Sequence, residues 1–484
     1  MMKILKTIVN AIAGFFNRMA DQEAERVIEL YRGICDDEPS KGGGKQMGNQ
    51  IKGGCQMRKG LQLAVLLGVI GMCLGTVTSY AGEVDILMQK LVDKGVLTAG
   101  EAQEVKTETQ EQVKKEIAEG KYSSLPAWVQ NTKLKGDLRL RYQYKHEKAT
   151  NDYAKDTHLG RLRARLGLER KVNDKILAGI GIATNSGGDP RSTNISFGDK
   201  NGGFSSKMEV RLDYAYAKYM PLSWLNIVGG KMLPTDVLWE PIDLVWDTDI
   251  TPEGGVIGFN KNIGSDMSLF MNTGILFGTA DTSTNADPVM MYLVQPGATY
   301  KFNERLSLKG AFSLYEWTNV KGTAYPTDSW YKSSNTKSGA NWAYNYEVIS
   351  PALELSIVEP FKAVGLNVEK LKFFGEYVNN LAVSDKNTGY ALGFQFGHDK
   401  VEKWGDWQFK YIYAMLAKDA VLDTTPDSDR YSGKTGMRSH EGALTFGLGK
   451  NTYLGFDVYR SWNIIGTSSK APETLVQVDS NMKF

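Results

Sequence analysis

Apolar and polar side chains alternate with a period of two in a series of segments that runs from Leu134 to the C-terminus. The first segment places Leu138, Leu140, Tyr142 and Tyr144 on one face and Asp137, Arg139, Arg141 and Gln143 on the other. Such alternation is typical of β-strands with one apolar and one polar face. About sixteen segments of roughly 9 to 15 residues show it, which is the length that a tilted strand needs to cross a bilayer.

The connections between these segments alternate between long and short. Long polar stretches occur near 145–157, 184–206, 234–252, 279–288, 317–344, 380–387, 418–439 and 463–472, and most of the other connections are tight, with 359–367 as the main exception. Sorted connections are expected when one barrel rim faces the outside and the other the periplasm. The sequence predicts an all-β fold, a transmembrane antiparallel β-barrel of about 16 strands over 131–484, with a soluble β-sandwich as the rival.

The first 130 residues follow other patterns. Arg58 and Lys59 precede an apolar run and the small-x-small triplet Ser79-Tyr80-Ala81, which predicts a signal peptide over 57–81. An export signal is normally read from the extreme N-terminus, so we interpret 1–56 as a leader or a start codon placed too early. Residues 82–130 are rich in Glu, Gln, Lys and Ala and predict a helical periplasmic segment, with Thr98 and Glu101 in a capping box.

Composition and charge narrow the class of protein. The mean hydropathy of −0.32 excludes a bundle of transmembrane helices. Without the first 81 residues the chain has 47 Lys and Arg against 48 Asp and Glu, so its net charge of +2 comes from the leader and indicates no nucleic-acid partner. All three cysteines lie in the first 73 residues, which leaves the predicted barrel free of cysteine.

The third long connection carries a resemblance to a known family. The stretches Gly230-Lys231-Met232-Leu233-Pro234 and 243–254, which reads DLVWDTDITPEG, resemble segments of the putative porins of Gram-negative outer membranes. The similarity extends over most of 134–484 and includes the helical N-terminal segment. It implies a passive diffusion channel for small hydrophilic solutes in the bacterial outer membrane, a homotrimer as general porins usually are, and no cofactor.

Charge selection is the chemistry that such a channel needs. Six arginines have the polar parity of neighbouring strands and predict a basic, pore-lining wall: Arg139, Arg141, Arg161, Arg163, Arg165 and Arg211. The third connection carries the acids Glu240, Asp243, Asp247, Asp249 and Glu253. In general porins this loop folds into the lumen, so these acids would face the arginines across a constriction. Alternatively, the arginines pair with nearby acids and the loop lies on the rim.

No motif indicates an enzyme or a metal site. The four histidines, His146, His158, His398 and His440, lack metal-ligand spacing. Ser439 and His440 are adjacent, which would place them on opposite faces of a strand. The function classes that remain are a general diffusion porin, a channel specific for anions or sugars, and a non-conducting structural or adhesive barrel.

Overall fold

The computed structural model describes most of the chain from residue 131 onward. The described residues are 92, 98, 100–101, 103–105, 108, 131–148, 154–185, 187–198, 207–279, 287–328, 330–331, 333–365, 368–465 and 472–484. The leader predicted over 1–56 and the signal peptide predicted over 57–81 lie outside them. No helix in this described part is both long and apolar enough to span a membrane.

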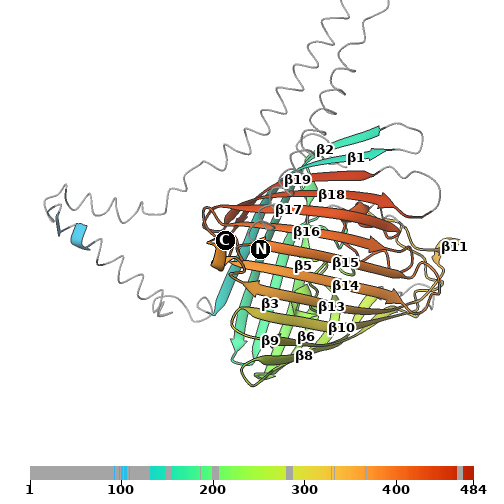
Figure 1. Cartoon of the computed structure of the whole chain (residues 1–484), viewed down its shortest axis with the longest axis horizontal. Helices are drawn as coiled ribbons and strands as arrows, with labels where there is room; N and C mark the ends of the chain where they lie inside the picture. The colour runs from blue at the N-terminus through green and yellow to red at the C-terminus, as the bar shows by residue number, and fades with distance from the viewer. Residues whose placement is uncertain are drawn as a thin grey trace, which may run out of the picture. The chain divides into compact units, whose positions relative to one another are not determined.

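Sixteen antiparallel strands of the described chain close into a barrel, which confirms the predicted fold (Figure 1). In order round the barrel they are β1 (Thr132–Lys148), β2 (Ala154–Asn173), β3 (Ile176–Thr184), β5 (Val210–Leu222), β6 (Leu225–Lys231), β7 (Glu253–Ile263), β8 (Met267–Thr279), β9 (Val289–Lys301), β10 (Leu306–Thr318), β13 (Tyr346–Val358), β14 (Lys370–Asn380), β15 (Thr388–Gly397), β16 (Trp407–Leu416), β17 (Met437–Gly449), β18 (Thr452–Asn463) and β19 (Glu473–Lys483).

The barrel closes where β1 pairs with β19, in a register that opposes Arg141 and Asp479. Gly136 and Phe484 extend this seam, because each backbone N–H donates to the carbonyl of the other, at 2.8 and 3.0 Å. A Cβ at Gly136 would lie 2.3 Å from the Phe484 ring. A side chain at this position would therefore push the terminal ring away from the seam.

The alternation seen in the sequence separates two faces of the wall. Large apolar side chains such as Leu166, Ile180 and Leu212 are exposed on the outward face, whereas polar side chains such as Gln295 and Glu376 are buried on the inward face. Outward aromatic rings gather near the strand ends, as where Phe396 packs edge-on against Trp407. Apolar residues outside and polar residues inside suit a barrel with lipid around it and water within.

Long and short connections alternate round the barrel, with one difference from the prediction. The predicted first loop, 145–157, is mostly strand, because β1 and β2 stay paired as far as Lys148 and Ala154. Among the connections predicted to be short, 174–175 and 450–451 are tight turns. The connection 359–369 is longer and holds η2 (Lys362–Val364), and 398–406 is longer as well. The second long connection contains β4 (Ile195–Ser196), which pairs with β2 beyond the end of β3.

Three long connections pack together against the inward face of the wall. They are the third loop (232–252), with η1 (Pro234–Asp236), the fifth loop (319–345), with β11 (Lys337–Ser338) and β12 (Asn341–Trp342), and the seventh loop (417–436), with η3 (Arg430–Gly433). Leu244 and Trp246 of the third loop share one buried apolar cluster with Val421 of the seventh loop and Tyr315 and Tyr346 of the wall. Burial of these side chains fixes the third loop against β10 and β13.

The N-terminal segment shows the predicted helix start. The Thr98 backbone N–H donates to Glu101 Oε2 at 2.8 Å, and the Glu101 N–H donates to Thr98 Oγ1 at 3.3 Å. This reciprocal pair is the predicted capping box, and described positions from 100 to 108 are helical.

Candidate functional site

Five of the six predicted arginines form one inward-facing group on β1 and β2. In the register of these strands Arg139 opposes Arg163 and Arg141 opposes Arg161, while Arg165 opposes Asp137. Opposed residues on paired strands lie side by side, so the five guanidinium groups share one part of the wall. We call these five residues the arginine group.

Arg211 stands apart from the arginine group. It lies on β5 and donates to Glu209 Oε2 at 2.8 Å, with its side chain 49% exposed. Strand β3 lies between Arg211 of β5 and Arg165 of β2, and its Ala183 is paired with both arginines. The structure therefore gives Arg211 a partner of its own and does not join it to the arginine group.

Acids on the wall itself pair with the arginine group. Arg141 makes a two-point contact with Asp479, with 2.7 Å from Nε to Oδ1 and 2.8 Å from Nη2 to Oδ2. Asp137 accepts from Arg163 at 2.9 Å and from Arg165 at 2.7 Å. Charge-assisted contacts of this kind hold guanidinium groups in fixed positions. Pairing with neighbouring wall acids is the alternative that the sequence analysis left open.

Among the described residues, the third-loop acid that forms ion pairs with the arginine group is Asp249. Its Oδ1 lies 3.4 Å from Arg165 Nη1 and 4.0 Å from Arg163 Nη1. Glu253 is not in the loop, because it begins β7, where it pairs with Lys231 at 3.0 Å and remains exposed. The predicted acids therefore do not all face the predicted arginines.

The other three predicted loop acids have different partners. Glu240 accepts a hydrogen bond from the Tyr315 hydroxyl at 3.0 Å. Asp243 pairs with Arg430 at 3.2 Å. Asp247 accepts from the backbone N–H groups of Asp249 at 2.9 Å and Ser428 at 2.8 Å. These contacts tie the third loop to the wall and to the seventh loop.

The seventh loop supplies charged groups that the sequence analysis did not single out. Asp429 pairs with Arg141 at 3.1 Å, and buried Arg430 donates to Glu441 of β17 at 2.6 Å. Lys410 of β16 lies 2.5 Å from the other oxygen of Glu441. The available signal was the Asp427-Ser428-Asp429-Arg430 stretch, in which charges are dense for a loop predicted to be long.

Burial and neighbouring charge change the acidity of the loop carboxyls. Burial, together with Asp427 and Asp249, raises the pKa of Asp247 well above its ordinary value. Burial and Asp243 also raise the pKa of Asp427 well above its ordinary value, although the charge of Arg430 acts in the opposite direction. Burial opposes ionisation of Asp429 too, but Arg141 and Arg161 outweigh it and hold the Asp429 pKa low. Burial therefore favours the neutral form of Asp247 and Asp427, whereas the neighbouring arginines favour the ionised form of Asp429.

Three carboxylates come close enough to suggest a metal site. Oxygen atoms of Asp243, Asp427 and Glu441 lie within 4.8 Å of one another. Arg430 is already among them, at 3.2, 3.7 and 2.6 Å from these three acids. A side chain of the protein thus already supplies positive charge among these three acids.

A charged cavity of about 190 Å³ lies where the arginine group meets the two loops. Arg139, Arg141 and Arg163 line it together with Asp243, Asp249 and Asp427. Its walls thus bring opposite charges together round one small space, where their fields act on any ion that enters.

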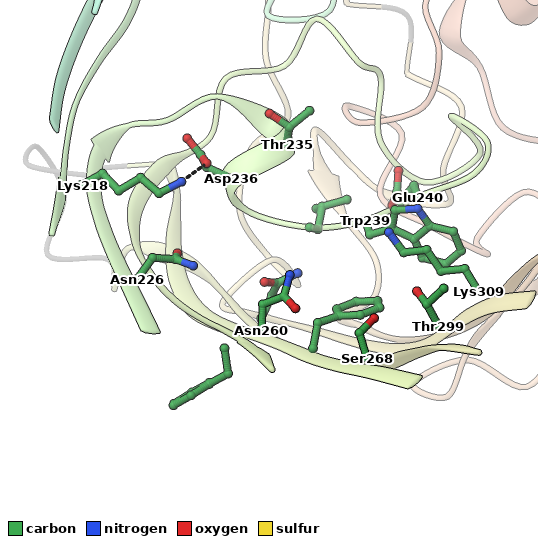
Figure 2. Close-up of a pocket in the computed structure, with 14 residues that line it drawn as sticks. Lys218, Asn226, Thr235, Asp236, Trp239, Glu240, Asn260, Ser268, Thr299 and Lys309 are labelled. Carbon is green, nitrogen blue, oxygen red and sulfur yellow. Dashed lines mark hydrogen bonds and ion pairs between the residues drawn. The ribbon is translucent and has the colours of Figure 1, made fainter. Parts of the chain in front are cut away.

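A larger cavity of about 380 Å³ lies between the third loop and the inward faces of β5 to β10, near the short turns. Figure 2 shows Trp239 and Lys309 on one side of it and the Lys218–Asp236 ion pair, at 2.7 Å, on the other. Glu240 also lines it, together with uncharged polar side chains: Asn226, Thr235, Asn260, Ser268, Asn272 and Thr299. Most of the side chains that line this cavity are uncharged, in contrast to the charged cavity.

Lys309 joins the third loop to the wall in the larger cavity. Its Nζ lies 4.5 Å from the centroid of the Trp239 ring and 5.0 Å from that of Phe270. The Trp239 backbone also exchanges hydrogen bonds with the Gln295 side chain, both at 2.8 Å. The aromatic ring is therefore held at a fixed place on the wall.

Ser439 and His440 lie on opposite faces of β17, as predicted from their adjacency. Ser439 is buried and its Oγ lies 2.8 Å from Ser461 Oγ, whereas His440 is exposed and its Nδ1 lies 2.6 Å from the Tyr411 hydroxyl. The two side chains therefore cannot act together on one substrate.

Comparisons with known proteins agree with this architecture. The family model described as "Putative porin" matches residues 96–157, 145–347 and 339–484. Among solved structures, a mutant porin of Rhodopseudomonas blastica is similar with 11% identity and a TM-score of 0.40, covering 73% of this chain and 100% of that chain. OprB of Pseudomonas putida is similar with 12% identity and a TM-score of 0.48, covering 73% and 94%. No curated protein matches. The chain belongs to the family described as "Putative porin", and it is a porin-like barrel of the bacterial outer membrane.

Proposed function

We propose that this protein allows passive diffusion of small hydrophilic solutes and ions through a water-filled barrel that the third loop narrows. The observation that carries the proposal is the approach of Asp249 to Arg165 and Arg163, beside the charged cavity. Opposite charges on facing walls create a transverse field, and such a field at a narrow point selects solutes by charge.

The proposal assigns each part of the site a role. The arginine group and Arg211 line the pore and attract anions, while Asp243 and Asp249 place negative charge on the facing loop. Wall acids such as Asp137 and Asp479 neutralise part of the basic charge, so we expect weak selectivity. The proposal also includes a homotrimer and a periplasmic position for the helical segment at 82–130.

The test is the current through the purified protein in a planar bilayer with a salt gradient. We expect stable ohmic steps, with a zero-current potential that gives the sign of ion preference. A folded barrel that inserts and remains silent would contradict the diffusion channel and favour the structural or adhesive barrel. Native mass spectrometry in detergent tests the trimer, for which a monomer alone would be the contrary result.

A second candidate is a sugar-specific channel, and the larger cavity favours it over an anion-specific one. Aromatic faces pack against the apolar face of a sugar ring, and amides and hydroxyls satisfy its hydroxyl groups. Trp239 supplies an aromatic side chain here, with the neutral polar side chains around it.

Disaccharide titration separates the two candidates. A specific channel predicts that maltose reduces the current of the wild type in a saturable way, and that Trp239→Ala removes this effect. Trp224→Ala is the matched control, because Trp224 is exposed on the outer surface against Phe259. A current that falls only in proportion to solution viscosity would exclude the sugar site and leave the general channel intact.

A further inference from the structure

Six polar and aromatic side chains form a patch on the outside of the barrel, at the ends of β16, β17 and β18 that adjoin the long loops. We call them the outer-rim cluster: Tyr411, Tyr413, Arg438, His440, Arg460 and Trp462. On β17, Arg438 and His440 are exposed and alternate with buried Met437, Ser439 and Glu441. They therefore share the outward face with the lipid-facing Leu444.

Aromatic rings hold the two arginines of the cluster. Arg438 Cζ lies 5.4 Å from the centroid of the Trp462 ring, and Arg460 Cζ lies 5.7 Å from it. His440 packs edge-on against Trp462 at 5.7 Å. Cation–π contact orients the Arg438 guanidinium group without neutralising its charge, so this group still attracts an anion.

No carboxylate of the described residues forms an ion pair with Arg438, which is exposed. The neighbouring loop, 464–472, reads IIGTSSKAP and contains no acidic residue. A different arrangement occurs at the same rim on β1 and β2, where Asp156 lies 2.7 Å from His146 Nδ1 and 3.2 Å from the Tyr144 hydroxyl. That group carries its own counter-charge, whereas Arg438 does not.

Positive charge on this outer surface is confined to one end of the three strands. Toward the short turns the outward positions are Phe409, Leu444, Phe446, Leu454 and Phe456, all apolar. An exposed arginine within hydrocarbon is costly, but at the headgroup level it meets phosphate. Because the long loops mark the outer rim, the cluster lies at the headgroups of the outer leaflet.

We propose that the outer-rim cluster binds the phosphate of an anionic lipid headgroup in the outer leaflet. Arg438 and Arg460, from neighbouring strands, donate to the phosphate oxygens in the forked geometry that guanidinium groups favour. Trp462 and Tyr413 lie at the boundary between headgroup and acyl chain, where amphipathic rings are most stable. This binding involves the outside of the barrel and does not depend on solute passage through the lumen.

The test measures binding of bisphosphoryl lipid A to the full protein in detergent by native mass spectrometry, with the dephosphorylated lipid as the matched probe. We expect Arg438→Gln and Arg460→Gln each to weaken binding of the phosphorylated lipid about five-fold, which corresponds to the loss of one cation near a charged membrane surface. Binding of the dephosphorylated lipid should not change. Arg305→Gln is the control, because Arg305 is an exposed arginine at a short turn.

Several results would overturn the proposal. One is equal binding of the two lipids by the wild type. Another is a loss of binding in Arg305→Gln as large as that in Arg438→Gln. A third is full competition by inorganic phosphate, which would show a site for free anions. Heat-modified mobility in gel electrophoresis verifies that each variant is a folded barrel. Bilayer currents of Arg438→Gln should equal those of the wild type, so failure of this proposal and failure of the diffusion channel are distinguishable.

Discussion

Arg430 of the seventh loop and Asp243 of the third loop form an ion pair, with 3.2 Å between Nη1 and Oδ1. The same guanidinium group donates to Glu441 of β17 at 2.6 Å. One buried side chain thus connects two loops that lie far apart in the sequence and fixes both to the wall. Removal of its charge would leave several buried acids without their main counter-ion.

Arg430→Met should therefore lower the free energy of unfolding by about 3–5 kcal/mol, since breaking a buried pair leaves an uncompensated charge. Thermal unfolding followed by near-ultraviolet circular dichroism measures this loss. Arg430→Lys is the control, which keeps the charge but not the forked geometry, and it should lose less. Equal stability of Arg430→Met and the wild type would show that the pair does not hold the loops.

Asp249→Asn should move the ion preference of the channel toward anions. The substitution removes the negative charge that lies 3.4 Å from Arg165, so the arginine group acts on passing ions with less opposition. The zero-current potential in a salt gradient is the measurement. Glu253→Gln removes the same charge at the start of β7, beside Lys231 of β6, and should cause a smaller shift. Equal shifts would mean that Asp249 has no special role in ion selection.

Contact between the third and seventh loops should weaken as pH rises above the ordinary carboxyl range. The raised pKa values of Asp247 and Asp427 mean that the folded chain binds more protons than the unfolded chain, so stability falls as pH rises toward the raised values. Asp429 acts in the opposite direction, because its lowered pKa gives stability that is lost at acid pH. Asp427→Asn should reduce the loss of stability at higher pH.

Unfolding midpoints measured from about pH 4 to about pH 8 test this dependence. The Asn side chain still offers an oxygen to the Asp429 N–H, which donates to Asp427 at 2.8 Å. Asp385→Asn is a suitable control, since Asp385 is exposed and pairs with its neighbour Lys386. Parallel profiles for Asp427→Asn and the wild type would exclude Asp427 as a source of the pH dependence.

Lys309→Met should loosen the third loop by about 1 kcal/mol, the usual strength of a partly buried cation–π contact. The change keeps the length of the side chain but removes the charge above the Trp239 and Phe270 rings. Increased current noise in single-channel records is the expected readout, with hydrogen exchange of 232–252 as an independent measure. Lys301→Met is the control, because Lys301 is an exposed residue at the end of β9.

The fold could be predicted because its signal is local. Side chains alternate with a period of two within each strand, so Leu138 and Arg139 indicate two faces without knowledge of any partner strand. The first connection was predicted too long, because His146 and Asp156 are polar and were interpreted as loop, although they pair across β1 and β2. Paired strands that extend beyond the membrane are surrounded by water, so their outward side chains can be polar.

The partners within the site could not be predicted, because they depend on contacts between distant segments. Arg141 and Asp479 are 338 positions apart, and they meet only because β19 closes the barrel against β1. The third loop was singled out by its resemblance and its acids, whereas the seventh loop had charge but no motif. The part that the seventh loop plays in the site is seen only in the folded chain, where Asp247 of the third loop accepts a hydrogen bond from the Ser428 N–H.

The close contact between Gly136 and Phe484 at the seam leads to a further prediction. Gly136→Ala should destabilise the barrel by about 1–3 kcal/mol, because the new methyl group would overlap the Phe484 ring at 2.3 Å and the Arg165 carbonyl at 2.9 Å. The double variant Gly136→Ala, Phe484→Ala should recover part of the loss in urea unfolding. Absence of any recovery would show that the carbonyl contact alone accounts for the effect.

The same seam bears on the order in which the barrel forms. Every other wall contact joins strands that follow one another along the chain, whereas β1 must find the last strand to be made. Closing so long a span costs the most chain entropy of any step, so a late, slow phase of folding should correspond to the meeting of the two ends. Until then both edge strands expose unpaired backbone groups, and the open sheet is most prone to pair with another chain.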